Sequence, residues 1–485
     1  MPRGTRYFCP ECGGAISVPA HHDRADCPYC RSHLLLKNGL RGRAPLISMD
    51  CPGCGASVHI PEDANTLRCS HCGGAHLLTG EGRPLRFYVP LQISEEEAKK
   101  EALAAIPHSA GARGAVPVFV PYWRMHGNMF HWESKTRRLR SKALDRSMPA
   151  GDFGIGLPSL GARLIRVNQR PYDRSEILKH GRVLNPILDA KKAEATLCDG
   201  AYHAFRDQNL ENEMEHGSII RRKMSLVWYP YWLMWIGTKR IVVDGACRGV
   251  IGSPGRLKNP KDAVRIHSDI PSLIAAVCPN CGGDFSIDGF EALYYCRYCQ
   301  ECWRPEGRRL VGQEILFVRC PAGGAKATHH LPVWRMQTSL KNPTSAFSDQ
   351  KAFRKLIPGW SYAAVRQDPK KPFFVYVPAW GNRLNPRMSA FAQRWTREQP
   401  DVQFEKRKFI RVFRALYGPR EAEELALITL LGVAYKCKPE VFLNAELNVS
   451  RCELLLVPSR KGSPEWIESV METAIPYCEM AEREF

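Results

Sequence analysis

The chain has 485 residues, 44% of them hydrophobic, and a formal net charge of +20. A single hydrophobic core stops growing at about 250–300 residues, so this length excludes a one-core protein and predicts several folded units. No run of about 18 or more apolar residues occurs, which excludes an ordinary membrane-spanning helix. The basic excess favours an acidic partner: nucleic acid, an anionic membrane surface or an acidic protein.

The first residues, Met1 to Gly4, lead into a cysteine pair without an apolar segment, so the sequence predicts no secretory signal. Of the 19 cysteines, twelve stand in paired C-x-x-C motifs. Such pairs present thiolates to zinc in proteins that stay in a reducing compartment. We therefore expect a cytoplasmic protein.

The same cysteine pattern occurs three times, as two C-x-x-C pairs separated by fourteen residues. Four thiolates at this spacing close a tetrahedral zinc site with no position for water, so each Zn²⁺ is predicted to be structural. A hairpin of about thirty residues buries too little apolar surface to fold alone, so the metal supplies the missing free energy. The predicted ligands are Cys9, Cys12, Cys27 and Cys30; Cys51, Cys54, Cys69 and Cys72; and Cys278, Cys281, Cys296 and Cys299.

Residues 1–45 and 46–85 are the first two predicted zinc ribbons. Three histidines lie in the second ribbon, at His59, His71 and His76, and each is an alternative ligand. Because four cysteines already fill the site, we expect these histidines on the surface.

An α+β domain is predicted over residues 86–275. Ser94 and Glu97 form a capping box, which opens a helix that continues to about Ile106. Periodicity then predicts a strand at 160–167, helices at 174–184 and 189–207, and a meander of short strands from Leu226 to Val243.

The third predicted ribbon, residues 276–312, carries an extra thiol at Cys302, and Cys320 follows downstream. Either thiol could exchange into the site or serve in redox chemistry, but four better-spaced ligands precede them, so both are predicted to be spare. The paired His329 and His330 resemble half of a metal site. Without matching cysteines or carboxylates they are predicted to be strand residues.

Residues 313–485 form a predicted C-terminal α+β region. Its patterns predict helices near 348–356, at 386–397, from Pro419 past Leu431 and at 464–473, strands at 373–380 and 452–458, and a basic strand or helix at 406–414. The expected fold class is therefore α+β multidomain, with three small β zinc ribbons and mixed α/β domains built on antiparallel sheets.

An apolar strand that reaches the motif P-x-W occurs at Pro121, Pro230, Pro332 and Pro378, and a fifth strand ends at Pro458 without the tryptophan. Proline has no N–H for a β-ladder, so we expect these prolines at sheet edges or bends. The tryptophans are expected to anchor the core.

Several of these motifs, taken in order, resemble bacterial zinc-ribbon proteins, described as transcription-factor-type zinc ribbons or as similar to the primosomal replication-restart helicase. After the two N-terminal ribbons they are Tyr88-Val89-Pro90-Leu91, Ser94-Glu95-Glu96-Glu97-Ala98, Val120-Pro121-Tyr122-Trp123, Tyr229-Pro230-Tyr231-Trp232 and Asp244-Gly245. The resemblance covers residues 1–255 and implies a non-catalytic scaffold, in some relatives within membrane-stress assemblies that contain band-7-like and phage-shock-type proteins. This chain differs by a third ribbon, a basic C-terminal region and the lack of the membrane segment that some relatives carry.

No phosphate-binding loop, nucleophile elbow or H-E-x-x-H motif is present, so the sequence predicts a non-enzymatic scaffold or adaptor without a small-molecule substrate. Its ribbons are expected to dock protein partners. The alternatives are binding of nucleic acid through the basic runs at 135–142 and 406–414, or docking of these runs to an anionic surface at the inner membrane. Near-neutral ribbons favour the scaffold, with 9 basic against 7 acidic residues in 1–85 and 4 against 5 in 276–312.

Overall fold

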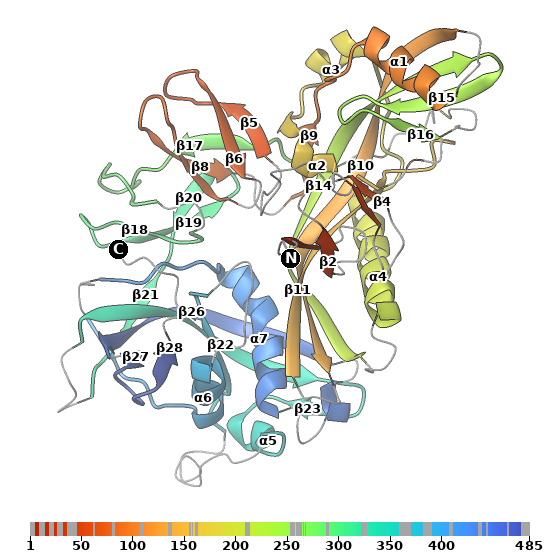
Figure 1. The fold of residues 1–485 in the computed structure, drawn as a ribbon. Coiled ribbons are helices and arrows are strands. Elements are labelled where there is room, and N and C mark those ends of the chain that lie inside the picture. The colour runs from red at the N-terminus through yellow and green to blue at the C-terminus, as the bar shows by residue number, and fades with distance from the viewer. Residues whose placement is uncertain are drawn as a thin grey trace. The chain divides into compact units, whose positions relative to one another are not determined.

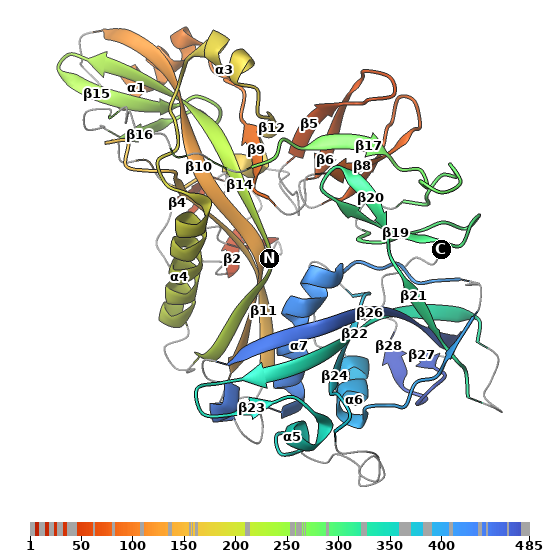
Figure 2. The ribbon, with the colours of Figure 1, turned by 180° about the vertical axis from the view of Figure 1, so that it is seen from behind.

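The protein has an α+β fold dominated by mixed β-sheets, as its computed structural model shows (Figures 1 and 2). The structure describes residues 5–8, 15–18, 24–26, 33–35 and 46–476, the last with gaps at 62–63, 80–82, 107–110, 134–137, 155–156, 158, 161–162, 209–213, 253–257, 259–263, 265, 267, 288–290, 322–326, 358–369, 382–389, 407–410, 435–438, 443–444 and 463–464. Near the N-terminus, β1 (Thr5–Phe8) pairs with β2 (Ala15–Val18), and β3 (Arg24–Asp26) pairs with β4 (His33–Leu35).

The chain forms two compact units. Unit 1 comprises Met1–Gly127, Ala143–Leu210 and Arg222–Ile274, and unit 2 comprises Asn128–Lys142, Glu211–Arg221 and Ala275–Phe485. The finer division into five segments remains a prediction.

Unit 1 is built on a ten-stranded sheet with the main order β11-β10-β14-β9-β12-β5-β6. Its strands are β5 (Leu46–Asp50), β6 (Ser57–Pro61), β9 (Leu85–Tyr88), β10 (Ala112–Glu133), β11 (Arg138–Pro149), β12 (Asn168–Pro171), β13 (Arg182–Val183), β14 (Met214–Ile236), β15 (Lys239–Asp244) and β16 (Val250–Gly252). A smaller sheet contains β7 (Thr66–Arg68), β8 (Ala75–Thr79) and β17 (Ser272–Ala275). The helices are α1 (Glu95–Ala105), α2 (Arg163–Arg166), α3 (Arg174–His180) and α4 (Ala190–Gln208). Both views show β10 and β14 side by side. The last residues of β10 and the first residues of β14 belong to unit 2.

Unit 2 is built on an eight-stranded sheet with the main order β23-β22-β26-β21-β25. Its strands are β21 (Ile315–Val318), β22 (His329–Lys341), β23 (Ala346–Phe347), β24 (Phe374–Pro378), β25 (Phe404–Glu405), β26 (Glu446–Lys461), β27 (Glu465–Glu468) and β28 (Ala474–Pro476). A small sheet contains β18 (Tyr294–Tyr295), β19 (Cys302–Glu306) and β20 (Arg309–Gly312). The helices are α5 (Gln350–Arg354), α6 (Ala390–Glu398), α7 (Pro419–Ala434) and the 3₁₀ turn η2 (Pro439–Phe442).

Both sheets are mixed, which corrects the expectation of antiparallel sheets. In unit 1, β9 runs parallel to β14, and in unit 2, β21 runs parallel to β26. The partners are far apart in sequence, so no hairpin forces them to be antiparallel.

The two sheets repeat one arrangement. In each, a short strand that follows a cysteine ribbon pairs parallel to a long strand that comes much later, β9 with β14 and β21 with β26. The long strand lies beside another long strand, β10 or β22, and then turns into a pair of short strands, β15–β16 or β27–β28. A helix precedes it in both cases, α4 or α7. One ribbon-and-sheet architecture therefore occurs twice in this chain.

The repeated prolines mark equivalent points of the two sheets. The carbonyls of Pro121 and Pro332 accept hydrogen bonds from the N–H groups of Ala150 and Ala379, each just past the end of a neighbouring strand. The carbonyls of Pro230 and Pro458 accept in the same way from Gly245 and Ser469. The expectation was a sheet edge or a bend, and these four prolines lie within long strands that are not sheet edges. Each is placed where the neighbouring ladder ends, so the missing N–H is tolerated there.

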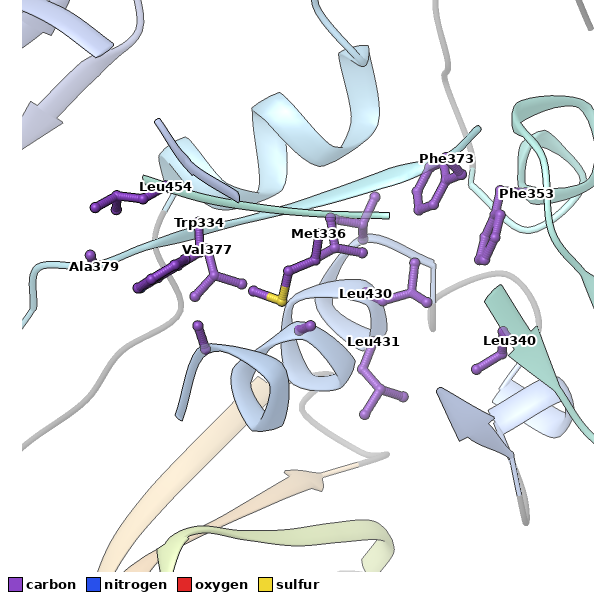
Figure 3. Close-up of a cluster of buried hydrophobic side chains, with 14 of the residues drawn as sticks. Trp334, Met336, Leu340, Phe353, Phe373, Val377, Ala379, Leu430, Leu431 and Leu454 are labelled. Atoms are coloured by element: carbon purple, nitrogen blue, oxygen red, sulfur yellow. The ribbon is translucent and has the colours of Figure 1, made fainter. Parts of the chain in front are cut away.

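The strands of unit 2 are buried on both faces. Trp334, Met336 and Leu454 pack in one hydrophobic cluster with Leu430 of α7 (Figure 3). Alternate residues of the same strands face a second cluster with α6, namely Leu331, Val333, Leu455 and Val457 against Phe391 and Trp395. This period of two places side chains on opposite faces, as a central strand requires.

Several local predictions are confirmed: the capping box of α1, the helices α4, α5 and α7, and the described part of the helix predicted at 386–397, which is α6. The helix predicted at 174–184 is confirmed only to His180, because residues 182–183 form β13. The strand predicted at 160–167 is instead the short helix α2, because Leu164 turns into the core of unit 1. The helix predicted at 464–473 is the hairpin β27–β28. The Glu468 carboxylate accepts the N–H groups of Val470, Met471 and Thr473, which closes the turn.

Candidate metal centres

The second predicted ribbon folds as two hairpins that bring their cysteines together. Cys51 follows β5 and Cys69 follows β7, so each C-x-x-C pair sits in the turn of a hairpin. The N–H of Gly55 donates to the Cys51 carbonyl, and Gly55 has a φ of 73°, a left-handed conformation that glycine adopts without strain.

The third predicted ribbon repeats this geometry in unit 2. Gly282 has a φ of 73° and donates its N–H to the Cys278 carbonyl. We call each C-x-x-C turn a knuckle. At the second knuckle of this ribbon, Gln300 takes the equivalent place with a φ of 65°, and its backbone N–H donates to the Cys296 carbonyl. The turn tightens around the cysteine carbonyl even without glycine.

The sulfur positions fit a four-thiolate metal site in both ribbons. All four Sγ atoms of each set, Cys51, Cys54, Cys69 and Cys72 or Cys278, Cys281, Cys296 and Cys299, lie within 4.8 Å of one another. The Sγ–Sγ distance is 3.8 Å for Cys51–Cys72 and for Cys54–Cys69, and 3.5 and 3.4 Å for the matching pairs of the third ribbon. Zn–S bonds of about 2.3 Å in a tetrahedron place sulfurs about 3.8 Å apart, a spacing that the second ribbon matches and the third approaches.

Local hydrogen bonds prepare one thiol for metal binding. The backbone N–H groups of Cys72 and His71 hold the pKa of Cys69 at about 6. Metal ligands must be thiolates, and a lowered pKa favours the thiolate form that metal binding requires. In each set the first and third cysteines are buried and the second is exposed.

The second ribbon is completed by a distant segment. β17, which begins 193 residues after Thr79, pairs with β8, and the Thr79 hydroxyl lies 2.7 Å from that of Ser272. Leu273 packs against the hydrophobic cluster of Cys51, Val58 and Cys69.

The third ribbon is joined to the core of unit 2. Ala292 donates its N–H to the carbonyl of Ala415 at 2.8 Å. Glu291, 1% exposed, forms an ion pair of 3.1 Å with Arg414. Leu293 and Tyr295 belong to the same hydrophobic cluster as Trp334, so folding of the ribbon and folding of the sheet depend on one another.

The structure places the remaining predicted residues as follows. The cysteines of the first ribbon, Cys9, Cys12, Cys27 and Cys30, lie outside the described residues. Cys302 is buried in the core of unit 2, where burial raises its pKa, and neither it nor Cys320 joins a metal-ligand cluster among the described residues. His329 and His330 are buried on β22, as predicted for strand residues.

His76 departs from its prediction. It is 5% exposed, and its Nε2 lies 3.3 Å from the Cys51 Sγ. Burial lowers the pKa of His76, which favours the neutral ring. The spacing of cysteines gave no signal for this contact, and strand alternation gave none either, because Leu77, next to His76 on β8, is also buried.

The basic runs are only partly described. The side chains of 135–142 and the residues 407–410 lie outside the described part of the chain. Arg411 is exposed, whereas Arg414 is buried in its ion pair with Glu291.

Comparison of the chain with protein families, with characterised proteins and with solved structures finds no match. Among the described residues, none of the helices is long and apolar enough to cross a membrane.

Proposed function

We propose that this protein is a non-catalytic, zinc-dependent scaffold that docks protein partners through its ribbons. The observation that supports this proposal is that both described clusters offer four cysteine donors. Four thiolates leave no open coordination position on zinc, so the metal would support the fold. The first ribbon is proposed as a third site of the same kind, with Cys9, Cys12, Cys27 and Cys30 as ligands.

A docking surface is proposed at the exposed knuckle of the third ribbon. Tyr298 is 59% exposed, and the Arg297 guanidinium lies 4.8 Å from its ring centroid. The ring rests on Gly283, where a Cβ would come within 2.4 Å of Tyr298 Cδ2. A fixed tyrosine beside an arginine provides contact area at small entropic cost, and both residue types are common in the centres of protein interfaces.

Metal analysis and partner capture test this proposal. We expect about three zinc ions per folded chain, and a zinc content near zero in a folded sample contradicts it. Tagged protein purified from its native lysate should retain a partner, which Tyr298→Ser loses while its zinc content stays unchanged. Leu178→Ser, at a side chain 52% exposed elsewhere on the surface, is the matched control. A protein that stays monomeric and captures no protein contradicts the scaffold.

The proposed location is a reducing cytoplasm, in agreement with the absence of disulfides among the described cysteines. The proposed relatives are bacterial multi-zinc-ribbon proteins, which the chain resembles in the order of its sequence motifs. Peripheral attachment to an anionic inner-membrane surface is a further proposal. Flotation with liposomes that contain or lack acidic lipid tests it.

The net charge of +20 supports nucleic-acid binding as a second candidate function. Two features oppose it: Arg414 is already paired with Glu291, and a zinc ion with four thiolates is a dianion, which makes each ribbon more acidic. Binding to random duplex and single-stranded DNA in a salt series tests it. A phosphate-tracking site must weaken steeply with salt, and no binding at low salt excludes this candidate.

A further inference from the structure

We propose that His76 is a positioning residue of the metal site of the second ribbon: its Nε2–H donates a hydrogen bond to the Cys51 thiolate and protects that site from electrophiles and from metal loss. This inference rests on the proposed metal binding. It assigns a role to a histidine that is not itself a ligand.

The contact is built into the ribbon. His76 lies on β8 opposite Leu67, four residues after Cys72, with Nε2 3.3 Å from the Cys51 Sγ. One glycine leaves room for the ring: a Cβ at Gly74 would lie 3.2 Å from His76 Nε2 and 3.4 Å from the Cys72 Sγ.

The chemistry fixes the direction of the hydrogen bond. A zinc-bound cysteine is a thiolate without a proton, so its sulfur can only accept. Nε2 must then carry the hydrogen, which leaves Nδ1 without one, and Nδ1 is buried with no partner among the described residues. A donor on the sulfur withdraws electron density, which makes the thiolate less nucleophilic.

The third ribbon provides an internal comparison. Trp303 follows Cys299 by the same four residues, and it lies opposite Tyr294 as His76 lies opposite Leu67. Its Nε1 has no hydrogen-bond partner among the described residues, so it donates to no sulfur there. The two sites share their cysteine spacing and differ at this position.

Burial alone predicts the opposite order of protection. The fourth cysteine is exposed in the second ribbon, at Cys72, and half-buried in the third, at Cys299. If accessibility decided, the third ribbon would react more slowly. The hydrogen bond from His76 predicts that the second ribbon reacts more slowly.

The test is the rate at which N-ethylmaleimide modifies each cysteine of the zinc-loaded full-length protein, followed by peptide mass spectrometry. We expect Cys51, Cys54, Cys69 and Cys72 to react more slowly than Cys278, Cys281, Cys296 and Cys299. Hydrogen-bond partners that orient metal ligands typically change metal affinity by about 10–100-fold. His76→Phe should therefore accelerate modification of the cysteines of the second ribbon about tenfold or more. His71→Phe, at an exposed histidine of the same knuckle, should leave it unchanged.

Two further variants keep the test decisive. Trp303→His should slow modification of the third ribbon, and His76→Gln, which retains an N–H donor, should restore part of the protection lost in His76→Phe. Equal rates in wild type and folded His76→Phe overturn the proposal. If His76→Phe does not fold, faster reaction of the second ribbon than of the third in the wild type overturns it, and the reverse order supports it. Absence of zinc would instead overturn the proposed function.

Discussion

Trp123 and Trp334 make the same hydrogen bond in two different sheets. The indole Nε1–H of Trp123 donates to the Leu188 carbonyl and that of Trp334 to the Tyr417 carbonyl, at 2.8 and 2.9 Å. Each acceptor stands two residues before a helix, α4 or α7. Together with the equivalent prolines, this contact shows that the chain repeats one ribbon-and-sheet arrangement, in which the tryptophan fixes the entry of a helix onto the sheet.

The first prediction concerns this tryptophan. Trp334→Phe keeps most of the packing but removes the donor to the Tyr417 carbonyl in a buried place. Loss of one partner of a buried hydrogen bond costs about 1–3 kcal/mol, so the free energy of unfolding in urea should fall by that amount. Trp235→Phe, at a side chain 37% exposed, should change it by no more than about 0.5 kcal/mol. Equal effects of both variants would contradict the role of the indole N–H.

The second prediction concerns the ion pair between the third ribbon and the core. Glu291→Gln removes the charge opposite Arg414 at a site where the two side chains are 1% and 10% exposed. Breaking a buried ion pair costs about 3–5 kcal/mol, so the free energy of unfolding in urea should fall by about that amount. Lys99→Ala breaks the exposed Glu95–Lys99 pair of α1 instead and should cost about 1 kcal/mol or less. A small effect of Glu291→Gln would show that Arg414 gains other partners.

The third prediction concerns the capping box of α1. The Ser94 side chain accepts from the Glu97 N–H at 3.2 Å, and Ser94→Ala should destabilise the protein by about 1 kcal/mol. The Ser94 N–H, with a smaller contribution from Arg248, lowers the pKa of Glu97 below its usual 4.5.

A lowered pKa in the folded state means that folding favours the ionised carboxylate. The stabilisation by Glu97 is therefore complete above about pH 4.5 and is lost as the pH falls through the folded-state pKa. The difference in melting temperature between wild type and Glu97→Gln should shrink as the pH decreases below 4.5. A difference that is constant with pH would exclude the carboxylate as its source.

The fourth prediction separates the structural role of the third ribbon from its docking role. Leu293 and Tyr295 share the core of Trp334, and structural zinc contributes on the order of 10 kcal/mol to small zinc-finger domains. The double variant Cys296→Ser and Cys299→Ser should therefore increase hydrogen exchange throughout β22 and α7. The matched variant Cys69→Ser and Cys72→Ser should increase it in β7, β8 and β17. Unchanged hydrogen exchange in β22, together with the loss of one bound protein partner, would assign the third ribbon to docking alone.

The sequence determined the features that depend on neighbouring residues. The cysteine spacing predicted both described metal clusters, and the Ser94–Glu97 motif predicted the start of α1. The four-cysteine pattern spans two successive hairpins and the capping box spans one helical turn, so each signal is complete within a short stretch of sequence.

Only the tertiary structure decided the features that depend on distant partners. The parallel pairing of Leu85 with Ser225 and of Ile315 with Leu454, and the addition of β17 to the second ribbon, join segments far apart in sequence. Strand pairing of this kind is set by which apolar faces meet, and a linear pattern does not contain that information. The hairpin at 465–476, predicted as a helix, and the buried position of His76 follow from the same cause: their partners, Phe413 for Trp466 and Cys51 for His76, lie outside the local pattern.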